Sequence, residues 1–287
     1  MICGIILSGG LSRRFQKPGE PWTDKALYSI YGKLMIEHLI DKLSSISPNI
    51  IVAAGSSDRV KLYSSIVRTS NIVYSTDDEM LVGPLSGLYS SLKLCTNSIF
   101  IALPNDTPYI PLKLLEEMIE LVESYDIVSP ILPNGLIETT IVAGKVDTAR
   151  WILEYLRGRG RSKVADLHRG APRIYLINVK SRGFKPEEFK NINRREDIEA
   201  KISDYPEGPL EDDVEIKREF NVRDVNEKNR SIIGSLWGTL LLGGYLEEFK
   251  LYTTRGAYML AAYTLEDSPN HYERALGKLI IESLKPL

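Results

Sequence analysis

The stretch that decides the fold is Ile2-Cys3-Gly4-Ile5-Ile6-Leu7-Ser8-Gly9-Gly10. The run from Ile2 to Leu7 carries no charge, which is typical of a strand buried on both faces of a sheet. It stops at Ser8-Gly9-Gly10, where the glycines let the backbone turn sharply and leave N–H groups free to meet a phosphate. A buried first strand with a phosphate-suited turn is how many α/β sheets begin.

The same alternation of apolar runs and amphipathic runs continues to residue 202. It predicts strands at 2–7, 50–54, 72–74, 98–103, 126–132, 139–143 and 173–179, and helices at 35–46, 60–66, 85–94, 111–122, 148–156, 164–168 and 191–202. Strand-helix alternation means mostly parallel strands, right-handed crossovers and helices on both faces. The predicted fold class is therefore a doubly wound, mostly parallel α/β sheet with a C-terminal helical appendage.

The end of the chain has a different pattern. Residues 1–204 are predicted to form one domain, 205–213 a linker rich in proline and acids, and 214–287 a small helical domain. Helices are expected there at 232–245, 257–263 and 272–284. The sequence leaves several roles open for this unit: self-association, docking of a partner protein, or a lid over the site.

Composition excludes several classes of protein. The 287 residues carry 36 Lys plus Arg and 38 Asp plus Glu, a net charge of −2, which argues against a nucleic-acid binder. Two cysteines and three histidines are too few for a disulfide framework or a Cys-rich zinc site. Cys3 is expected to be a small core residue, and we expect a cytoplasmic, reducing compartment with no secretory signal. The uncharged run at 231–246 is shorter than a membrane span, so no membrane association is expected.

Charged side chains follow the strands at the edge where ligands bind in such sheets. Arg14 and Lys25 come after the first strand, and Asp106 comes after the strand at 98–103. A carboxylate at a strand end suits Mg²⁺, which takes one or two carboxylates together with substrate phosphates. The turn fits neither a Walker A loop nor G-x-G-x-x-G, and from the glycines alone a plain turn is about as probable as a phosphate loop.

Four motifs in the same order resemble those of the molybdenum cofactor guanylyltransferase family, within the nucleotide-sugar-transferase-like superfamily. They are Leu7-Ser8-Gly9-Gly10-Leu11-Ser12-Arg13-Arg14 with Asp24-Lys25-Ala26-Leu27, then Gly83-Pro84-Leu85-Ser86-Gly87, Asn105-Asp106-Thr107-Pro108 and Phe189-Lys190-Asn191-Ile192-Asn193. The resemblance spans residues 1–199. It implies a Rossmann-type nucleotidyltransferase that moves GMP from GTP to molybdopterin, with Mg²⁺ and release of pyrophosphate. On this resemblance, a protein that docks on the helical unit would be a molybdoenzyme.

The resemblance also implies residue roles. Arg14, Lys25 and Asp106 would be catalytic, with Asp106 as the metal ligand. The nucleotide-binding set would be Leu7, Ser8, Gly9, Gly10, Lys25, Gly83, Pro84, Leu85, Gly87 and Asp106, with Asp77 or Asp78 as a further acidic contact, and the acceptor set Asn191, Asn193 and Arg161. The resemblance is not complete: the loop from Phe15 to Asp24 is longer than the family pattern, and Gly55 follows the second strand where an asparagine is common.

Purely structural explanations compete with some of these roles. The basic segment 157–163, which contains Arg161, is more simply a solvated connection between helices. Asn191 and Asn193 would also serve as a turn and a helix cap, although the motif around them favours binding. Ser86 has no G-x-S-x-G context and is not expected to be a nucleophile.

Two other functions fit the same sequence. One keeps the fold and changes a substrate, giving a molybdopterin cytidylyltransferase or a sugar-phosphate nucleotidyltransferase. The other is a scaffold protein that binds nucleotide without catalysis, but Arg14, Lys25 and Asp106 are all present, which argues against it.

Overall fold

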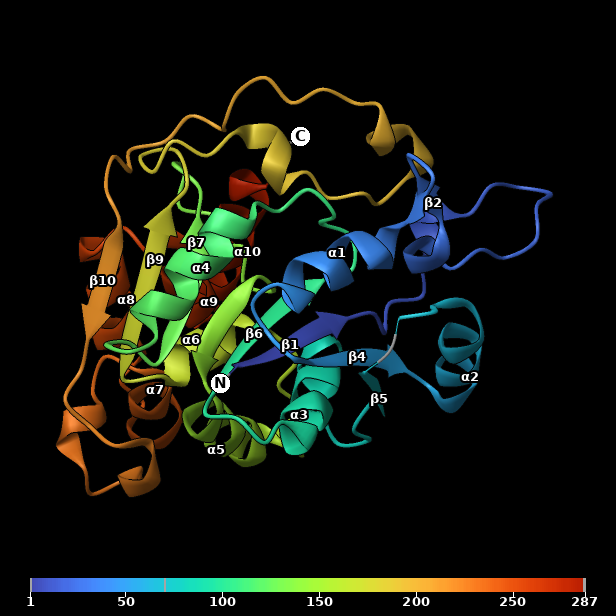
Figure 1. Ribbon diagram of the computed structural model, residues 1–287. Helices are drawn as coiled ribbons and strands as arrows, with labels where there is room; N and C mark the ends of the chain where they lie inside the picture. The colour runs from blue at the N-terminus through green and yellow to red at the C-terminus, as the bar shows by residue number, and fades with distance from the viewer. Residues whose placement is uncertain (1, 70, 286–287) are drawn as a thin grey trace.

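The protein is described here from a computed structural model, which defines residues 2–69 and 71–285. One large sheet runs through the molecule in the strand order β10-β9-β7-β8-β6-β1-β4-β5, and a small β2-β3 hairpin lies beside it (Figure 1). The strands of the large sheet are β1 (Ile2–Leu7), β4 (Asn49–Gly55), β5 (Ile72–Thr76), β6 (Ile99–Pro104), β7 (Ile127–Ile131), β8 (Val142–Lys145), β9 (Arg173–Asn178) and β10 (Val214–Lys217). The hairpin is β2 (Ser29–Ile30) and β3 (Lys33–Leu34).

The sheet is mostly parallel around its first strand, as the sequence predicts. β1 pairs in parallel with β4 and with β6, and β4 pairs in parallel with β5. β8 is antiparallel to both β6 and β7, and β10 is antiparallel to β9. The predicted fold class is confirmed.

Helices cover both faces of the sheet. α1 (Met35–Ser44), α2 (Ser57–Ile66) and α4 (Leu112–Leu121) share one apolar core with Ile6 of β1. α3 (Pro84–Leu94), α5 (Val146–Leu156) and α6 (Ala165–Gly170) share the opposite core with Ile5. Neighbouring residues of β1 point to opposite faces, so the uncharged run beginning at Ile2 is buried on both sides.

The C-terminal residues join the second of these cores. They form α7 (Leu236–Leu242), α8 (Tyr245–Thr254), α9 (Tyr258–Glu266) and α10 (His271–Leu284). Trp237, Tyr252 and Leu260 are buried together with residues of β1 and α3. The division into a domain at 1–204 and another at 214–287 stays a prediction, but the last part of the chain is packed against the body of the protein.

Three sequence predictions about local structure were wrong. Residues 191–202 form only a short 3₁₀ turn, Arg195–Ile198, because Asp197 binds the N–H groups of Asn193 and Arg194 and closes the chain tightly. The helix expected at 232–245 is shorter, because Gly243 adopts a left-handed conformation (φ 67°) that ends α7, and α8 follows as an unpredicted helix. The strand β10 was not predicted either, because four residues are too few for the alternation of buried and exposed side chains to identify a strand.

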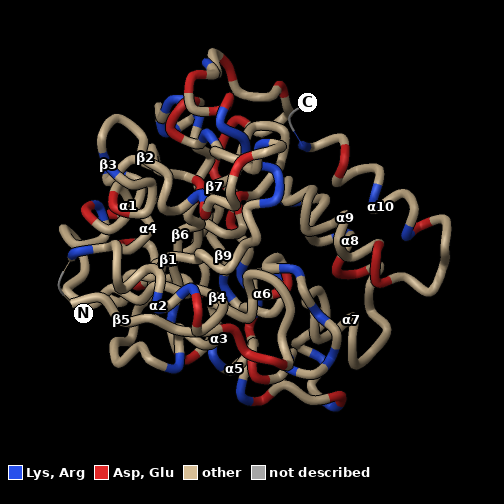
Figure 2. Tube along the Cα trace, turned by 90° about the vertical axis from the view of Figure 1, so that its right-hand side faces the viewer, with Lys and Arg blue, Asp and Glu red and all other residues tan. Residues whose placement is uncertain are grey.

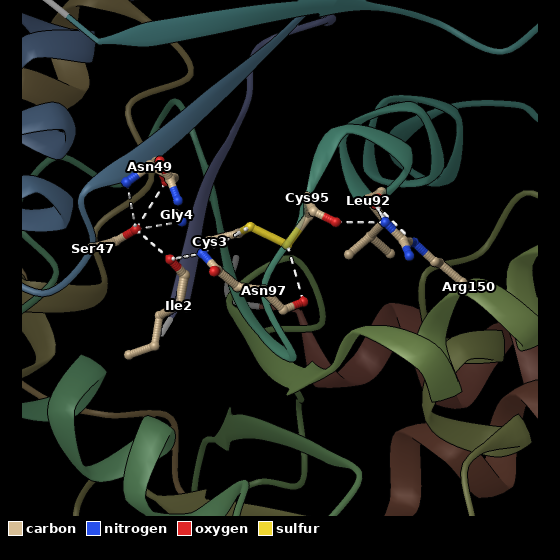
Figure 3. Close-up of a disulfide and its surroundings, with 9 residues drawn as sticks. All are labelled: Ile2, Cys3, Gly4, Ser47, Asn49, Leu92, Cys95, Asn97 and Arg150. Atoms are coloured by element: carbon tan, nitrogen blue, oxygen red, sulfur yellow. Dashed lines mark hydrogen bonds between the residues drawn. A yellow bond between two sulfur atoms is a disulfide. The ribbon is translucent and has the colours of Figure 1, made fainter.

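Cys3 is buried as expected, but it is bonded to another residue. It forms a disulfide with Cys95, the residue that ends α3 (Figure 3). The bond links β1 to the helix packed on it, across 92 positions of sequence. The prediction that Cys3 is a small core residue is confirmed, but its bond to Cys95 was not predicted, and the inference of a reducing compartment loses its basis in the cysteines. Among the described residues, no helix is long and apolar enough to cross a membrane.

Candidate nucleotide-binding site

A pocket lies at the carboxyl ends of the parallel strands, the position where ligands bind in doubly wound sheets. Its volume is about 430 Å³. β1 ends before Gly9, β5 before Asp77 and β6 before Asp106, so parallel pairing alone brings these three residues to one edge. The lining residues are Leu7, Gly9, Gly10, Lys25, Ala53, Asp77, Gly83, Pro84, Gly87, Pro104, Asn105, Asp106, Glu138, Thr140 and Asn191.

The floor of the pocket is made of glycines packed around Asp77. A side chain at Gly55 would place its Cβ 2.9 Å from the Cα of Gly9, and Gly55 has a φ of +88°. A Cβ on Gly87 would lie 3.0 Å from that of Ala53 and 3.4 Å from the Asp77 carboxylate. These positions tolerate only glycine without rearrangement, which keeps space open for a flat ligand. Burial raises the pKa of Asp77, and nearby Arg59 and Ser86 oppose that shift.

The two charged groups expected to act on phosphates are in contact. The Lys25 ammonium donates to the Asp106 carboxylate at 2.7 Å, and the two side chains are 10% and 18% exposed. A cation and a carboxylate that meet at the mouth of a glycine-lined pocket can separate to serve an anionic ligand and its metal. Asp106 follows the end of β6 directly, whereas Lys25 opens the short turn Lys25–Leu27 after the long loop that follows β1.

A buried hydrogen-bond network joins the loops that carry these groups. Tyr63 of α2 is fully buried, and its hydroxyl lies 2.7 Å from that of Ser8 and 2.8 Å from the Asp24 carboxylate. Asn105 donates to the Ser8 hydroxyl at 2.8 Å. Asp24 in turn accepts from Arg59 at 2.6 Å and caps the turn that begins at Lys25.

The Arg59 side chain completes this network, because it also donates to the carbonyl of Gly10 at 3.0 Å. One connected set of contacts therefore holds the Gly9–Gly10 loop, the Lys25 turn and the Asn105–Asp106 turn. We call Ser8, Asp24, Arg59, Tyr63 and Asn105 the Tyr63 network. Sequence reasoning missed Tyr63 and Arg59, because α2 carries no motif and meets the loops only in the folded chain.

The choice between Asp77 and Asp78 is one that the sequence left open. Asp77 lines the pocket, whereas the Asp78 carboxylate accepts from Arg157 at 3.0 Å and lies 3.6 Å from the Lys93 ammonium. Burial would raise the pKa of Asp78, but the Arg157 and Met80 hydrogen bonds and the nearby cations outweigh it and lower the pKa. The geometry favours Asp77 as the acidic contact to a ligand.

Several other predicted site residues lie behind or beside the pocket. Leu85 is completely buried, and Ser8 uses its N–H on the carbonyl of Ala53, so neither faces the cavity. Arg14 is exposed and donates to Asn193 at 3.0 Å, outside the lining, while Asn191 is part of it. Arg14 and Asn193 are thus brought together at the rim.

Arg161 is held away from the pocket. Its guanidinium forms ion pairs with Asp166 and Asp267, each with a shortest distance of 2.6 Å. These contacts raise the pKa of Arg161 despite its burial. The expectation that Arg161 binds an acceptor therefore has no support in this geometry, because its donors are already used.

Glu138 and Thr140 line the pocket and were not predicted. Glu138 is the only charged residue between Asp126 and Lys145. Its isolation in an uncharged stretch is a sequence signal that could have identified it as a site residue. The Glu138 side chain is half-buried where it lines the pocket. Burial, and then the negative charge of Asp106, raise its pKa to about 7.

The donor set fits a hard cation that is shared with a ligand. No group of three or more His, Cys, Asp or Glu side chains in the described parts of the chain could hold a metal unaided. Asp106 supplies a carboxylate at the pocket, and Mg²⁺ commonly takes one or two carboxylates and completes its octahedron with phosphates and water. A metal that arrives with a phosphorylated ligand therefore suits this pocket better than a resident one.

Comparisons with known proteins find nucleotidyltransferase relatives, in agreement with a pocket that suits a phosphorylated ligand. The family model described as the MobA-like NTP transferase domain matches residues 4–171. A protein of Pyrococcus horikoshii named probable molybdenum cofactor guanylyltransferase is 32% identical, with 69% of this chain matched to 97% of the relative. A similarly named protein of Pyrococcus furiosus is 31% identical, with 69% of this chain matched to 95% of it.

Solved structures share the fold. Molybdopterin-guanine dinucleotide biosynthesis protein A of Archaeoglobus fulgidus superposes with a TM-score of 0.54 at 19% identity, covering 68% of this chain and 94% of that one. A cytidylyltransferase of Thermus thermophilus, named for 2-C-methyl-D-erythritol 4-phosphate, gives a TM-score of 0.52 at 14% identity, over 69% and 96%. At these identities the likeness speaks for the fold alone.

Proposed function

We propose that this chain, which belongs to the MobA-like NTP transferase family, transfers GMP from GTP to molybdopterin and releases pyrophosphate. The observation that carries the proposal is the meeting of Gly9–Gly10, Lys25 and Asp106 in one pocket. The relatives in Pyrococcus, whose names state guanylyltransferase activity, support GTP as the donor. We also propose that the chain acts in the cytoplasm, where it would meet GTP.

The pocket accounts for nucleotide binding in two parts. Gly9 and Gly87 leave room for a flat base, and the Asp77 carboxylate can accept hydrogen bonds from N–H or O–H groups of the nucleoside. The N–H groups of Gly9 and Gly10 make no hydrogen bond within the described chain and would meet the phosphates.

The reaction needs no covalent enzyme intermediate. A phosphate oxygen of the acceptor attacks the α-phosphorus of GTP, a P–O bond forms, and the bond to the β-phosphate breaks with its electron pair leaving on pyrophosphate. Positioning and charge neutralisation then supply most of the rate. Lys25 would leave Asp106 and neutralise charge on the α-phosphate, and Arg14 would meet the triphosphate from the rim. Asp106 would hold Mg²⁺, which neutralises phosphate charge. Asn191 and Asn193 would lie on the acceptor side.

The test is thermal unfolding of the full chain with GTP, CTP, ATP or UTP, each with and without Mg²⁺. A ligand at one hundred times its dissociation constant stabilises the folded state by about 2.7 kcal/mol, which gives a clear rise in Tm. We expect a GTP-selective, Mg²⁺-dependent rise that is lost in Asp106→Asn. A matched control is Asp58→Asn, an exposed acid of α2 outside the pocket. Selectivity for CTP or UTP, or no rise with any nucleotide, would refute the proposal.

Transfer itself is tested by supplying GTP and molybdopterin and following pyrophosphate release. Lys25→Ala should abolish release while GTP still raises Tm. If Lys25→Ala released pyrophosphate at the wild-type rate, the assignment of Lys25 to the α-phosphate would be wrong.

A further inference from the structure

The last part of the chain has no role in the function proposed so far. We call residues 214–285 the extension. It lies outside the family model, which ends at residue 171, and the Pyrococcus horikoshii relative is matched over nearly its whole length by only 69% of this chain. The helices of the extension lie together along one side of the body (Figure 2). The contacts between the extension and the body show which segments of the body it holds in place.

A buried ionic cluster ties the extension to α6. The Arg169 guanidinium is fully buried and donates to both oxygens of Glu248 at 2.8 Å, and to Asp267 at 2.7 Å. Asp267 also accepts from Arg161, which is paired with Asp166. Burial would raise the pKa of Asp267, but its two arginine partners lower it. Buried charges of this kind are tolerated only when fully paired, so Asp267 and Glu248 are needed by the arginines of the body.

Arg161 of this cluster belongs to the basic segment that connects α5 to α6. Residues 157–163 contain four cations, and two glycines in the left-handed region, Gly158 (φ 74°) and Gly160 (φ 68°). Like charges repel and glycines add backbone freedom, so such a segment needs acidic partners to take one conformation. The extension supplies them: Asp267 pairs with Arg161, and Glu266 pairs with Lys163.

The other side of this segment touches the loop that forms one wall of the nucleotide pocket. Arg157 donates to Asp78 at 3.0 Å, and the Gly158 N–H donates to the Met80 carbonyl at 3.1 Å. The Ser162 carbonyl would lie 3.7 Å from a Cβ on Gly83, a residue that lines the pocket. The contacts therefore run without a break from the extension, through 157–163, to the loop between Asp77 and Gly83.

A second contact reaches the pocket from another direction. The Ile137 N–H points at the Met259 sulfur at 3.3 Å, and the Asn134 side chain donates to the Leu284 carbonyl at 2.6 Å. Both residues belong to the β7–β8 connection that carries Glu138 into the pocket. The extension thus supports two separate walls of one cavity.

We propose that the extension positions the walls of the nucleotide pocket, with Asp267 as the positioning residue that holds 157–163 against the loop from Asp77 to Gly83. The inference rests on the proposed function, because it assigns the pocket to a nucleotide. Asp267 touches no substrate and acts through Arg161, Arg169 and the segment between them.

The experiment compares Asp267→Asn with Ser268→Ala in the full chain. Ser268 is the next residue, and its hydroxyl donates to Glu273 and accepts from the Asn270 N–H, both within the extension, so Ser268→Ala is a matched control. The dissociation constant for GTP with Mg²⁺ should rise about tenfold in Asp267→Asn and stay unchanged in the control. Asp267→Glu, which keeps the charge, should recover most of the affinity.

A second readout separates positioning from general stability. Amide hydrogen exchange, measured well below each Tm, should speed up at 78–83 and 158–162 in Asp267→Asn while the amides of β1 and β6 stay protected. Arg161→Gln breaks the same Arg161–Asp267 ion pair from the arginine side. It replaces Asp267→Asn in the experiment if that variant does not fold.

Two results would overturn the inference: GTP affinity within twofold of wild type in Asp267→Asn despite a lower Tm, or exchange at 78–83 no faster than in the control. A wild-type chain that binds no GTP would instead refute the proposed function, and the exchange measurement would still decide whether the extension orders these walls.

Discussion

The hydroxyl of Tyr63 lies 2.8 Å from the Asp24 carboxylate, and both groups are buried beneath the pocket. Through this contact a helix with no sequence motif fixes the turn that carries Lys25. Burial, and then the charge of Asp24, raise the pKa of Tyr63, so the phenol stays protonated and keeps its donor. Hydrogen bonds among Ser8, Tyr63 and Asn105 extend this support, so that three loops are held in one geometry.

Tyr63→Phe should lower the free energy of unfolding by about 1–3 kcal/mol, because buried partners such as Asp24 and Ser8 lose a hydrogen bond. It should also weaken GTP binding, since the loops carrying Gly10 and Lys25 lose a common support. The measurements are urea unfolding and calorimetric titration with GTP and Mg²⁺. Tyr74→Phe is the control, because Tyr74 lies outside the pocket and burial alone raises the pKa of its phenol. Equal unfolding energies for the two variants would contradict the role of the Tyr63 network.

Glu138 should make stability depend on pH. Its pKa is raised to about 7 in the folded state against 4.5 ordinarily, so the folded chain keeps a proton that the unfolded chain releases. Its contribution is full below pH 4.5 and is lost as the pH rises through 7, by at most about 3 kcal/mol. Unfolding of the ligand-free chain measured from pH 4.5 to 8 should show a smaller decline in Glu138→Gln than in wild type. Parallel pH profiles for the two proteins would rule this out.

Removing the disulfide should destabilise the chain and leave the pocket intact. The bond between Cys3 and Cys95 closes a loop of 92 residues, for which restriction of the unfolded chain predicts a loss of about 2–5 kcal/mol. The double variant Cys3→Ser, Cys95→Ser should unfold at lower urea and no longer respond to reductant. GTP affinity should not change, because neither cysteine lines the pocket. A loss of affinity at a temperature where the variant is folded would show that the bond also shapes the site.

Gly87→Ala should separate binding from stability. Alanine favours a helix by about 1 kcal/mol over glycine, which offsets the crowding of a Cβ 3.0 Å from that of Ala53. The same Cβ intrudes beside Asp77 on the floor of the pocket, so GTP affinity should fall at least about tenfold while Tm changes little. Ser90→Ala, on the same helix but outside the pocket, is the control. Unchanged affinity would place the base elsewhere in the cavity.

Gly9 and Asp106 were predictable as neighbours, because each closely follows the end of a buried strand, β1 and β6. Parallel pairing brings such positions together in any doubly wound sheet, whereas Lys25 lies on a longer loop and was predicted from its motif, Asp24-Lys25-Ala26-Leu27. Local pattern was therefore enough to place them at one edge. The pairing of Arg161 with Asp267 was not predictable, because the two residues lie 106 positions apart and no local signal relates them.

What the sequence determined by itself was the order of the elements, the buried first strand and the chemistry of the loops at its end, since these depend on local periodicity and on residue type. The tertiary structure decided what lies beneath and behind those loops: the Tyr63 network, the disulfide from Cys3, the place of Glu138 and the pairing of the extension with α6. Each of these joins residues far apart in the chain. Their energy comes from burial and from charges that must find partners, and those conditions exist only once the chain has folded.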